Sequence, residues 1–181
     1  MILNRRRMIA AAGALAGTAA LGVRRASAAA DTSSKRIALY NLHTEERLDL
    51  EYFHDGAYQP KALAALQVFL RDYRNGEQHA IDPKLMDYLV EVAGGLGMQP
   101  SYSVISGYRS PQTNGHLHDA GHHVAQHSLH MEGRAIDVRM TDLDCAVLAA
   151  HAREMQRGGV GYYRAENFVH LDTGRYRTWN G

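Results

Sequence analysis

Alternation of apolar and polar side chains predicts several strands along the chain. In residues 36–42, Ile37 and Leu39 share one face with Asn41, while the residues between them point the other way. A turn at 43–46 then separates this strand from an alternating run at 48–52, which predicts a hairpin. Further strands are predicted at 101–107, 134–140, 158–163 and 167–172.

Apolar residues at three- and four-residue spacing predict three long helices, at 60–73, 82–93 and 141–157. Pro60 suits the first turn of the first helix, and Gly76 is expected to follow its end. Asp82 is the expected N-cap of the second helix, and Thr141 or Asp142 that of the third. Residues 111–128 have no clean period and are expected to form a loop with a short helix.

The first thirty residues have the pattern of an export signal. Arg5, Arg6 and Arg7 precede a run rich in Ala and Gly at 9–23, and Ala26-Ser27-Ala28 offers a cleavage site. Paired arginines before a weakly apolar run are typical of twin-arginine signals. We expect a signal at 1–30, a linker at 31–35, one domain at 36–181 and a periplasmic location. An uncleaved membrane anchor is the alternative, but the run is short for a span.

Composition and charge exclude some classes of function. With 45% hydrophobic and 22% charged residues, the chain resembles an ordinary soluble domain. Without residues 1–28 it has 15 basic and 19 acidic residues, a net charge of −4, which gives no electrostatic reason to bind nucleic acid. The single cysteine, Cys145, excludes an intrachain disulfide and is interpreted as a buried apolar residue.

Two predicted strands carry a candidate metal site. Asp137 lies on one face of 134–140, and His130 precedes that strand by about one turn. His170 and Asp172 share a face of 167–172. His130, Asp137 and His170 with an open position suit one zinc ion, which would activate water and polarise a carbonyl. Asp172 is predicted to be catalytic as a general base, or else to orient His170. The alternative for any single histidine is a satisfied core or surface residue.

Two polar residues outside the ligand set are candidates for holding substrate. Arg109 follows the strand at 101–107 and can bind a carboxylate through two parallel hydrogen bonds. The equal alternative is a structural arginine that pairs with a nearby acid. Ser128 precedes His130 and is predicted to help hold a peptide. Five histidines fall within 116–127. They are interpreted either as part of a lid, an accessory metal site or a pH-sensitive rim, or as solvated polar residues.

Ordered sequence blocks extend these observations to a family. Ser128-x-His130-x-x-Gly133-x-Ala135-x-Asp137 with His170-x-Asp172 resembles the zinc metallopeptidases of the D-alanyl-D-alanine carboxypeptidase (LAS) type, peptidase family M15. The blocks 41–44, 69–74, 106–110, 158–163 and 167–174 are similar to the murein endopeptidase K group. The resemblance implies a small α+β domain with a mainly antiparallel sheet packed by about three long helices, as in Hedgehog and D,D-peptidase domains. It also implies that His130, Asp137 and His170 bind zinc.

The same resemblance implies a substrate. The group cuts peptide crosslinks of peptidoglycan, in particular those that join two diaminopimelate residues. Two features depart from the pattern: Asn167 stands where many wider-family members have Glu, and the 116–127 segment is rich in histidine rather than in serine and basic residues. The leading interpretation is an exported zinc endopeptidase of murein. The alternatives are a D,D- or L,D-carboxypeptidase that trims peptide stems and a non-catalytic module that binds murein or metal.

Overall fold

The computed structural model describes residues 34–121 and 124–181. The expected signal at 1–30 and the first residues of the expected linker lie outside the described residues. The last two linker residues do not form a linker, because the first strand already begins at Ser34.

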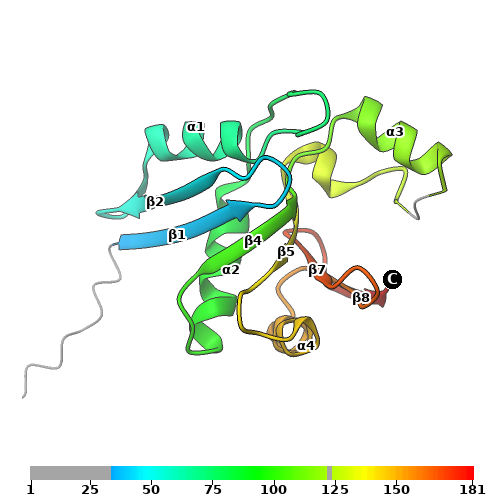
Figure 1. Cartoon of the computed structure of the whole chain (residues 1–181). Coiled ribbons are helices and arrows are strands. Elements are labelled where there is room, and N and C mark those ends of the chain that lie inside the picture. The colour runs from blue at the N-terminus through cyan, green and yellow to red at the C-terminus, as the bar shows by residue number, and fades with distance from the viewer. Residues whose placement is uncertain (1–33, 122–123) are drawn as a thin grey trace, which may run out of the picture. The chain divides into compact units, whose positions relative to one another are not determined.

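In the part of the chain that the structure describes, one sheet of eight strands forms the scaffold (Figure 1). Its strands are β1 (Ser34–Asn41), β2 (Arg47–His54), β3 (Ala57–Tyr58), β4 (Ser101–Ser106), β5 (Ala135–Arg139), β6 (Gly159–Tyr163), β7 (Phe168–Asp172) and β8 (Arg177–Asn180). They lie in the order β3-β2-β1-β4-β5-β7-β6-β8. β3 and β8 were not predicted from the pattern.

The sheet corrects part of the expected fold class. The domain is α+β, but the sheet is neither small nor of the expected mainly antiparallel kind: it is a mixed sheet in which β1 pairs with β4, and β6 with β8, in parallel. The reason is in the connections. A parallel pair needs a crossover, and the chain between β1 and β4 includes two helices, while β7 intervenes between β6 and β8.

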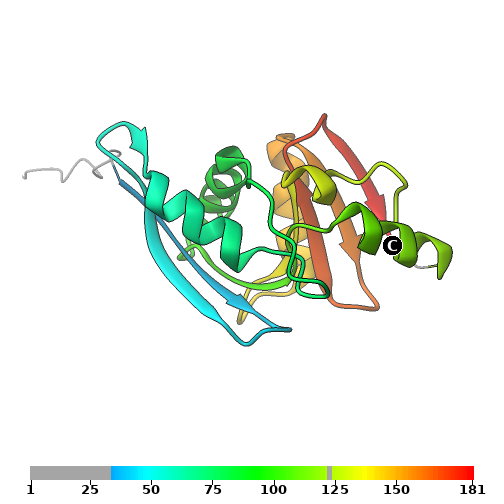
Figure 2. The same ribbon diagram turned by 90° about the horizontal axis from the view of Figure 1, so that it is seen from above.

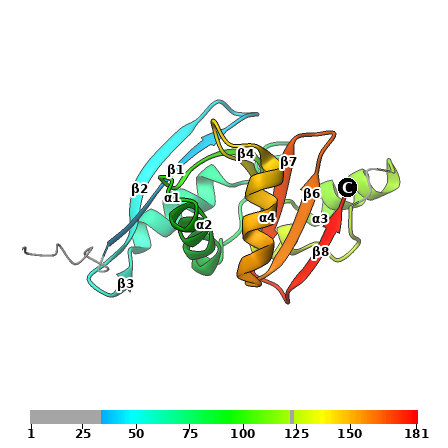
Figure 3. The ribbon, with the colours of Figure 1, turned by 90° about the horizontal axis from the view of Figure 1, so that it is seen from below.

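The described residues form four α-helices: the three expected ones, all shorter than expected or shifted, and one in the segment 111–128, where a short helix was expected. They are α1 (Pro60–Phe69), α2 (Pro83–Gly95), α3 (Pro111–Asp119) and α4 (Cys145–Met155), with a 3-10 helix, η1, at Leu129–Glu132. In Figures 2 and 3, α1, α2 and α4 lie on the same side of the curved sheet. α3 stands apart from them, at the end of the molecule that carries β6, β7 and β8.

The caps explain the corrected helix ends. Asp82 caps α2 as predicted, since its side chain accepts a hydrogen bond from the Lys84 N–H. α1 ends at Phe69 with Leu70 as its C-cap, six residues before Gly76. α4 begins at Cys145 because Asp144, and neither Thr141 nor Asp142, accepts the hydrogen bond of a first-turn N–H, that of Ala146.

The core lies between the sheet and these three helices. In β1, burial of Ile37, Leu39 and Asn41 follows the predicted alternation. Leu85 and Leu89 of α2 and Leu148 of α4 are fully buried against the strands. Within the described residues, no helix is long and apolar enough to cross a membrane.

β5 and β7 position the site. Four of the five residues in each strand are buried, which requires that both faces of these strands are covered. Their antiparallel register places Asp137 opposite His170, and Ala135 opposite Asp172. Side chains of directly opposed residues point to the same face, so the register alone brings the two predicted ligands of these strands together.

Candidate metal centre

His130, Asp137 and His170 converge on one point. The His170 Nδ1 atom lies 2.9 Å from Asp137 Oδ1 and 3.2 Å from His130 Nε2. The His130 Nε2 atom lies 3.3 Å from Asp137 Oδ1. All three residues are buried. Within the described part of the chain, they are a group of side chains whose ligand atoms lie close enough together to hold a metal ion.

The short η1 helix delivers His130. The Ser128 Oγ atom accepts a hydrogen bond from the His130 N–H and caps the helix at its start. Gly133 ends the helix with a φ of 64°, and a Cβ atom there would lie 2.1 Å from the Ala80 carbonyl oxygen. Only glycine fits this left-handed position against the neighbouring backbone, so Gly133 fixes where the ligand segment sits.

The second nitrogen of each histidine fixes the direction of the first. His130 Nδ1 lies 2.6 Å from the Gly107 carbonyl oxygen, which can only accept. His170 Nε2 lies 3.0 Å from the Asp172 carboxylate. When these nitrogens donate, His130 Nε2 and His170 Nδ1 carry lone pairs. Both lone pairs then face the Asp137 oxygen, which is the arrangement that supports a metal-bound imidazole.

The donor set fits a small divalent ion. Two ligand atoms, each about 2.0–2.1 Å from a tetrahedral zinc ion, lie roughly 3.3 Å from each other. The three separations of 2.9–3.3 Å are near that value. Three acceptor atoms crowded together in a buried place repel one another unless a cation or protons lie among them. Two imidazoles and one carboxylate are ligands that zinc accepts, with a fourth position left for water or substrate.

The ionisation states of the three side chains also favour a metal site. Burial opposes ionisation of Asp137, but the adjoining His130 and His170 outweigh it and hold the pKa of Asp137 well below its usual range. Burial lowers the pKa of His130 and favours its neutral ring, whereas hydrogen bonds to Asp137 and Asp172 outweigh burial at His170 and raise its pKa, so that a proton on His170 balances the carboxylate when no ion is bound. The carboxylate is therefore ionised, and a neutral His130 is ready to act as a ligand.

Asp172 lies behind His170 and is saturated with donors. Its side chain is fully buried. Arg177 of β8 binds both oxygens, at 3.0 and 2.7 Å, and the N–H groups of Gly159 and Gly174 donate to Oδ1. Burial alone would raise the pKa of Asp172, but the bonds from His170 and Arg177 outweigh it and hold that pKa well below its usual range.

An aromatic side chain from β8 covers His170. The Trp179 ring centroid lies 5.2 Å from that of His170, and its Nε1–H donates to the Tyr163 hydroxyl at 3.0 Å. A Cβ atom on Gly161 would lie 2.5 Å from the indole, so the glycine makes room for it. Arg177 and Trp179 were not predicted from the sequence, because β8 has only four residues. The glycines at 158–161 were the one available signal, since they mark close packing.

Arg109 and Ser128 both lie at the centre. The Arg109 guanidinium is 3.7 Å from Asp137 Oδ2 and 3.4 Å from Asn114 Oδ1, and its buried Nε–H has no partner among the described atoms. Its backbone N–H donates to the His130 carbonyl oxygen. Ser128 is buried as the cap of η1. Arg109 thus has both features considered from the sequence, a nearby acid and free hydrogen-bonding capacity.

The two departures from the family pattern lie away from the ligands. Asn167 is exposed in the turn between β6 and β7 with a φ of 55°, a conformation that asparagine tolerates well. Of the histidine-rich segment, His116, His118 and His127 are exposed. His122 and His123 lie outside the described residues.

Comparisons with known proteins agree with this geometry. A family model described as Peptidoglycan L,D-endopeptidase MepK (Peptidase_M15_2) matches residues 28–179. The peptidoglycan L,D-endopeptidase MepK of Escherichia coli K12 is 38% identical over 176 residues, which cover 97% of each chain, and that of Shigella flexneri matches equally. The probable peptidoglycan L,D-endopeptidase MepK of Haemophilus influenzae is 36% identical over 152 residues, 83% of this chain and 82% of that protein. The chain belongs to the MepK family of peptidase M15 proteins, the murein endopeptidase K group that its sequence blocks resemble.

Proposed function

We propose that this protein is a zinc endopeptidase that hydrolyses peptide crosslinks of peptidoglycan, with diaminopimelate-containing bonds as its targets. Membership of the MepK family carries the reaction class. The observation that carries the metal is the convergence of His130, Asp137 and His170 within 3.3 Å. These three side chains would hold one ion, which when bound supplies Lewis acidity for the scissile carbonyl and acidifies a water.

The chain's own residues prepare the centre in defined ways. The Gly107 carbonyl and the Asp172 carboxylate hold the two imidazoles in the tautomers that binding requires. Of the two roles considered for Asp172, orientation of His170 has the stronger support, because both carboxylate oxygens are already engaged by Arg177 and by backbone N–H groups. A carboxylate so stabilised in its ionised form is a weak proton acceptor.

Arg109 and Ser128 are proposed to hold the peptide. The Arg109 Nε–H, beside Asp137, has no partner within residues 34–121 and 124–181, and a buried guanidinium with free donors binds carboxylate or carbonyl oxygens strongly. The Ser128 oxygen accepts from the His130 N–H, and its own hydroxyl hydrogen is left to donate to a peptide carbonyl.

The proposed substrate supports a location in the cell envelope. The relatives are named for action on peptidoglycan. Together with the arginine-containing leader read from residues 1–30, this supports export to the periplasm by the twin-arginine route.

Digestion of purified sacculi tests the proposal. Zinc-loaded protein is expected to release shorter muropeptides, detected by mass spectrometry, and a chelator or His130→Ala is expected to abolish release. His54→Ala, which changes an exposed histidine of β2, is the control and is expected to digest normally. Undiminished digestion by His130→Ala would overturn the metal mechanism. Trimming of uncrosslinked stems with no cleavage of crosslinked dimers would show a carboxypeptidase instead, and metal and sacculus binding without any turnover would show a non-catalytic module.

A further inference from the structure

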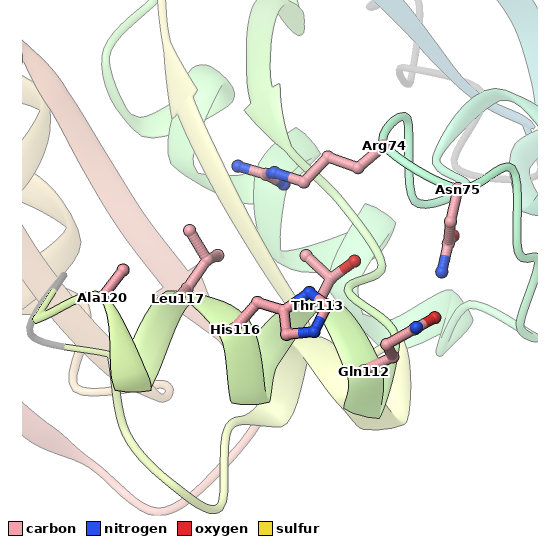
Figure 4. Close-up of a pocket in the computed structure, with 7 residues that line it drawn as sticks. All are labelled: Arg74, Asn75, Gln112, Thr113, His116, Leu117 and Ala120. Carbon is pink, nitrogen blue, oxygen red and sulfur yellow. The ribbon is translucent and has the colours of Figure 1, made fainter.

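A hollow of about 300 Å³ lies between α3 and the loop that follows α1. It is lined by Arg74, Asn75, Gln112, Thr113, His116, Leu117 and Ala120. In Figure 4 the Arg74 side chain extends from its loop across the space beside α3, and Asn75 points towards Gln112. None of the lining residues is acidic, so the hollow presents one full positive charge and several polar groups.

Arg74 is held in place without being neutralised. Its backbone N–H donates to Asp72 Oδ1 at 3.1 Å, which fixes the start of the side chain. Its guanidinium lies 4.2 Å from the centroid of the Tyr73 ring, and that ring stacks on His43 at 3.9 Å. Stacking on an aromatic face leaves the edge of a guanidinium, where its donors lie, free for an anion.

Among the described residues, Arg74 lacks the acidic partner that several other arginines have. Arg71, three residues earlier, binds Glu46 at 2.9 Å, and Arg177 binds Asp172 at 2.7 Å. No carboxylate among residues 34–121 and 124–181 lies within ion-pair distance of the Arg74 guanidinium. A fixed, exposed arginine without an acid of its own is a suitable partner for a carboxylate on a ligand.

A short series of contacts connects the hollow with the metal centre. Asn75 donates to the Ser110 hydroxyl at 2.9 Å, and Ser110 directly follows Arg109. Arg109 in turn lies 3.7 Å from Asp137. Burial lowers the pKa of Arg109 while Asp137 opposes this, and the charge of Arg74 is close enough to lower that pKa further.

We propose that this hollow is a subsite for a free carboxylate of the peptide stem, bound by Arg74 while the scissile amide lies at the metal centre. The inference rests on the proposed function and deepens it by naming what the enzyme recognises away from the reacting bond. The ligand class is an anionic peptide with an unamidated carboxylate. A stem amidated at that position offers no charge to Arg74 and binds more weakly.

Steady-state kinetics on two defined crosslinked dimers tests the subsite. One dimer has free stem carboxylates, and the other has the same carboxylates amidated. On the free dimer, Arg74→Met is expected to raise KM about tenfold, the effect of one lost charge-assisted contact, with kcat within about twofold of wild type. On the amidated dimer, wild type and Arg74→Met are expected to have the same, raised KM.

Arg47→Met is the matched control. Arg47 also lies 4.2 Å over a tyrosine ring, that of Tyr40, but it does not line the hollow. It is expected to behave as wild type on both dimers. Equal KM values for Arg74→Met and Arg47→Met on the free dimer would overturn the subsite, as would an equal loss for Arg74→Met on both dimers.

Calorimetric binding of an uncrosslinked stem peptide with free carboxylates to the zinc-loaded protein separates the two proposals. Arg74→Met is expected to weaken this binding about tenfold relative to wild type and Arg47→Met. If wild type cleaves neither dimer, the proposed function fails while the calorimetry still decides on the subsite. Unchanged peptide binding by Arg74→Met would overturn the subsite alone.

Discussion

The Asp137 carboxylate and the His170 imidazole face each other across one pair of hydrogen-bonded strands, with 2.9 Å between Oδ1 and Nδ1. Sheet register, rather than a loop, therefore sets the distance between two of the three candidate ligands. His130 alone reaches the centre from a short helix, and it depends on Ser128 and Gly133 at the ends of that helix. Strand pairing therefore controls the positions of Asp137 and His170, whereas the two ends of η1 control the position of His130.

Asp172→Asn distinguishes the two roles of Asp172. If the carboxylate orients His170, the variant is expected to bind zinc about 10–100-fold more weakly, yet to retain turnover once zinc is saturating. Competition with a chromophoric chelator measures the affinity, and assays at raised zinc measure the turnover. Unchanged zinc affinity with abolished turnover would instead assign the general base to Asp172.

Arg177→Met is expected to affect His170 indirectly, through the Asp172 carboxylate that both residues contact. The variant leaves the fully buried Asp172 carboxylate with its remaining hydrogen bonds but without its cation. Since Arg177 is itself partly exposed, we expect a loss of about 2 kcal/mol in the free energy of unfolding and a weaker affinity for zinc. Urea denaturation and chelator competition check both effects. Arg164→Met, in the turn between β6 and β7, is the control, and an equal response from it would contradict the assigned role.

Gly133→Ala is expected to be far more harmful than Gly97→Ala, although both glycines have a positive φ, of 64° and 68°. At Gly97 a Cβ atom meets nothing within 4 Å, so only backbone strain of about 1 kcal/mol is expected. At Gly133 the Cβ atom also collides with the Ala80 carbonyl, which raises the loss to about 3 kcal/mol or more. Urea denaturation of both variants gives the comparison, and similar midpoints would refute the close approach.

The pH dependence of stability is expected to change in Asp72→Asn. Burial alone would raise the pKa of Asp72, but hydrogen bonds from Thr113 and from the Ser110 and Arg74 backbones outweigh it and hold that pKa below its usual value. A carboxyl with a depressed folded-state pKa contributes stability above its unfolded pKa of about 3.9 and loses it as the pH falls below that value. Asp72→Asn should therefore be less stable than wild type at pH 7, with the difference shrinking as the pH falls below about 3.9, as measured by urea denaturation across pH.

The sequence was sufficient for the parts of the fold with a local signature. The alternation in β1, the N-cap at Asp82 and the shared face of His170 and Asp172 all follow from periods of two or from capping chemistry. Strand order was not accessible in this way, because pairing partners far apart in the chain leave no local pattern. The resemblance gave a mainly antiparallel sheet, and the parallel pairs of β1 with β4 and of β6 with β8 correct it.

The environment of the candidate ligands was harder to predict than the ligands themselves. Arg177 and Trp179 come from a four-residue strand that no period identifies. Their importance follows from packing against Gly159 and Gly161, which only a tertiary structure reveals. The first helix was predicted to continue to residue 73, but α1 stops at Phe69, and Asn75 donates to Ser110, the N-cap of α3.

The pairing of β7 between β5 and β6 also makes this centre sensitive to chain length. Val169 and Leu171 face the core while His170 and Asp172 face the metal centre, so a shift of β7 by a single residue would exchange the two sets. Replacing residues in the turn at 164–167 leaves that alternation intact, whereas deleting one of them forces a choice between the core and the centre. Evolution of this hairpin is thus freer in composition than in length.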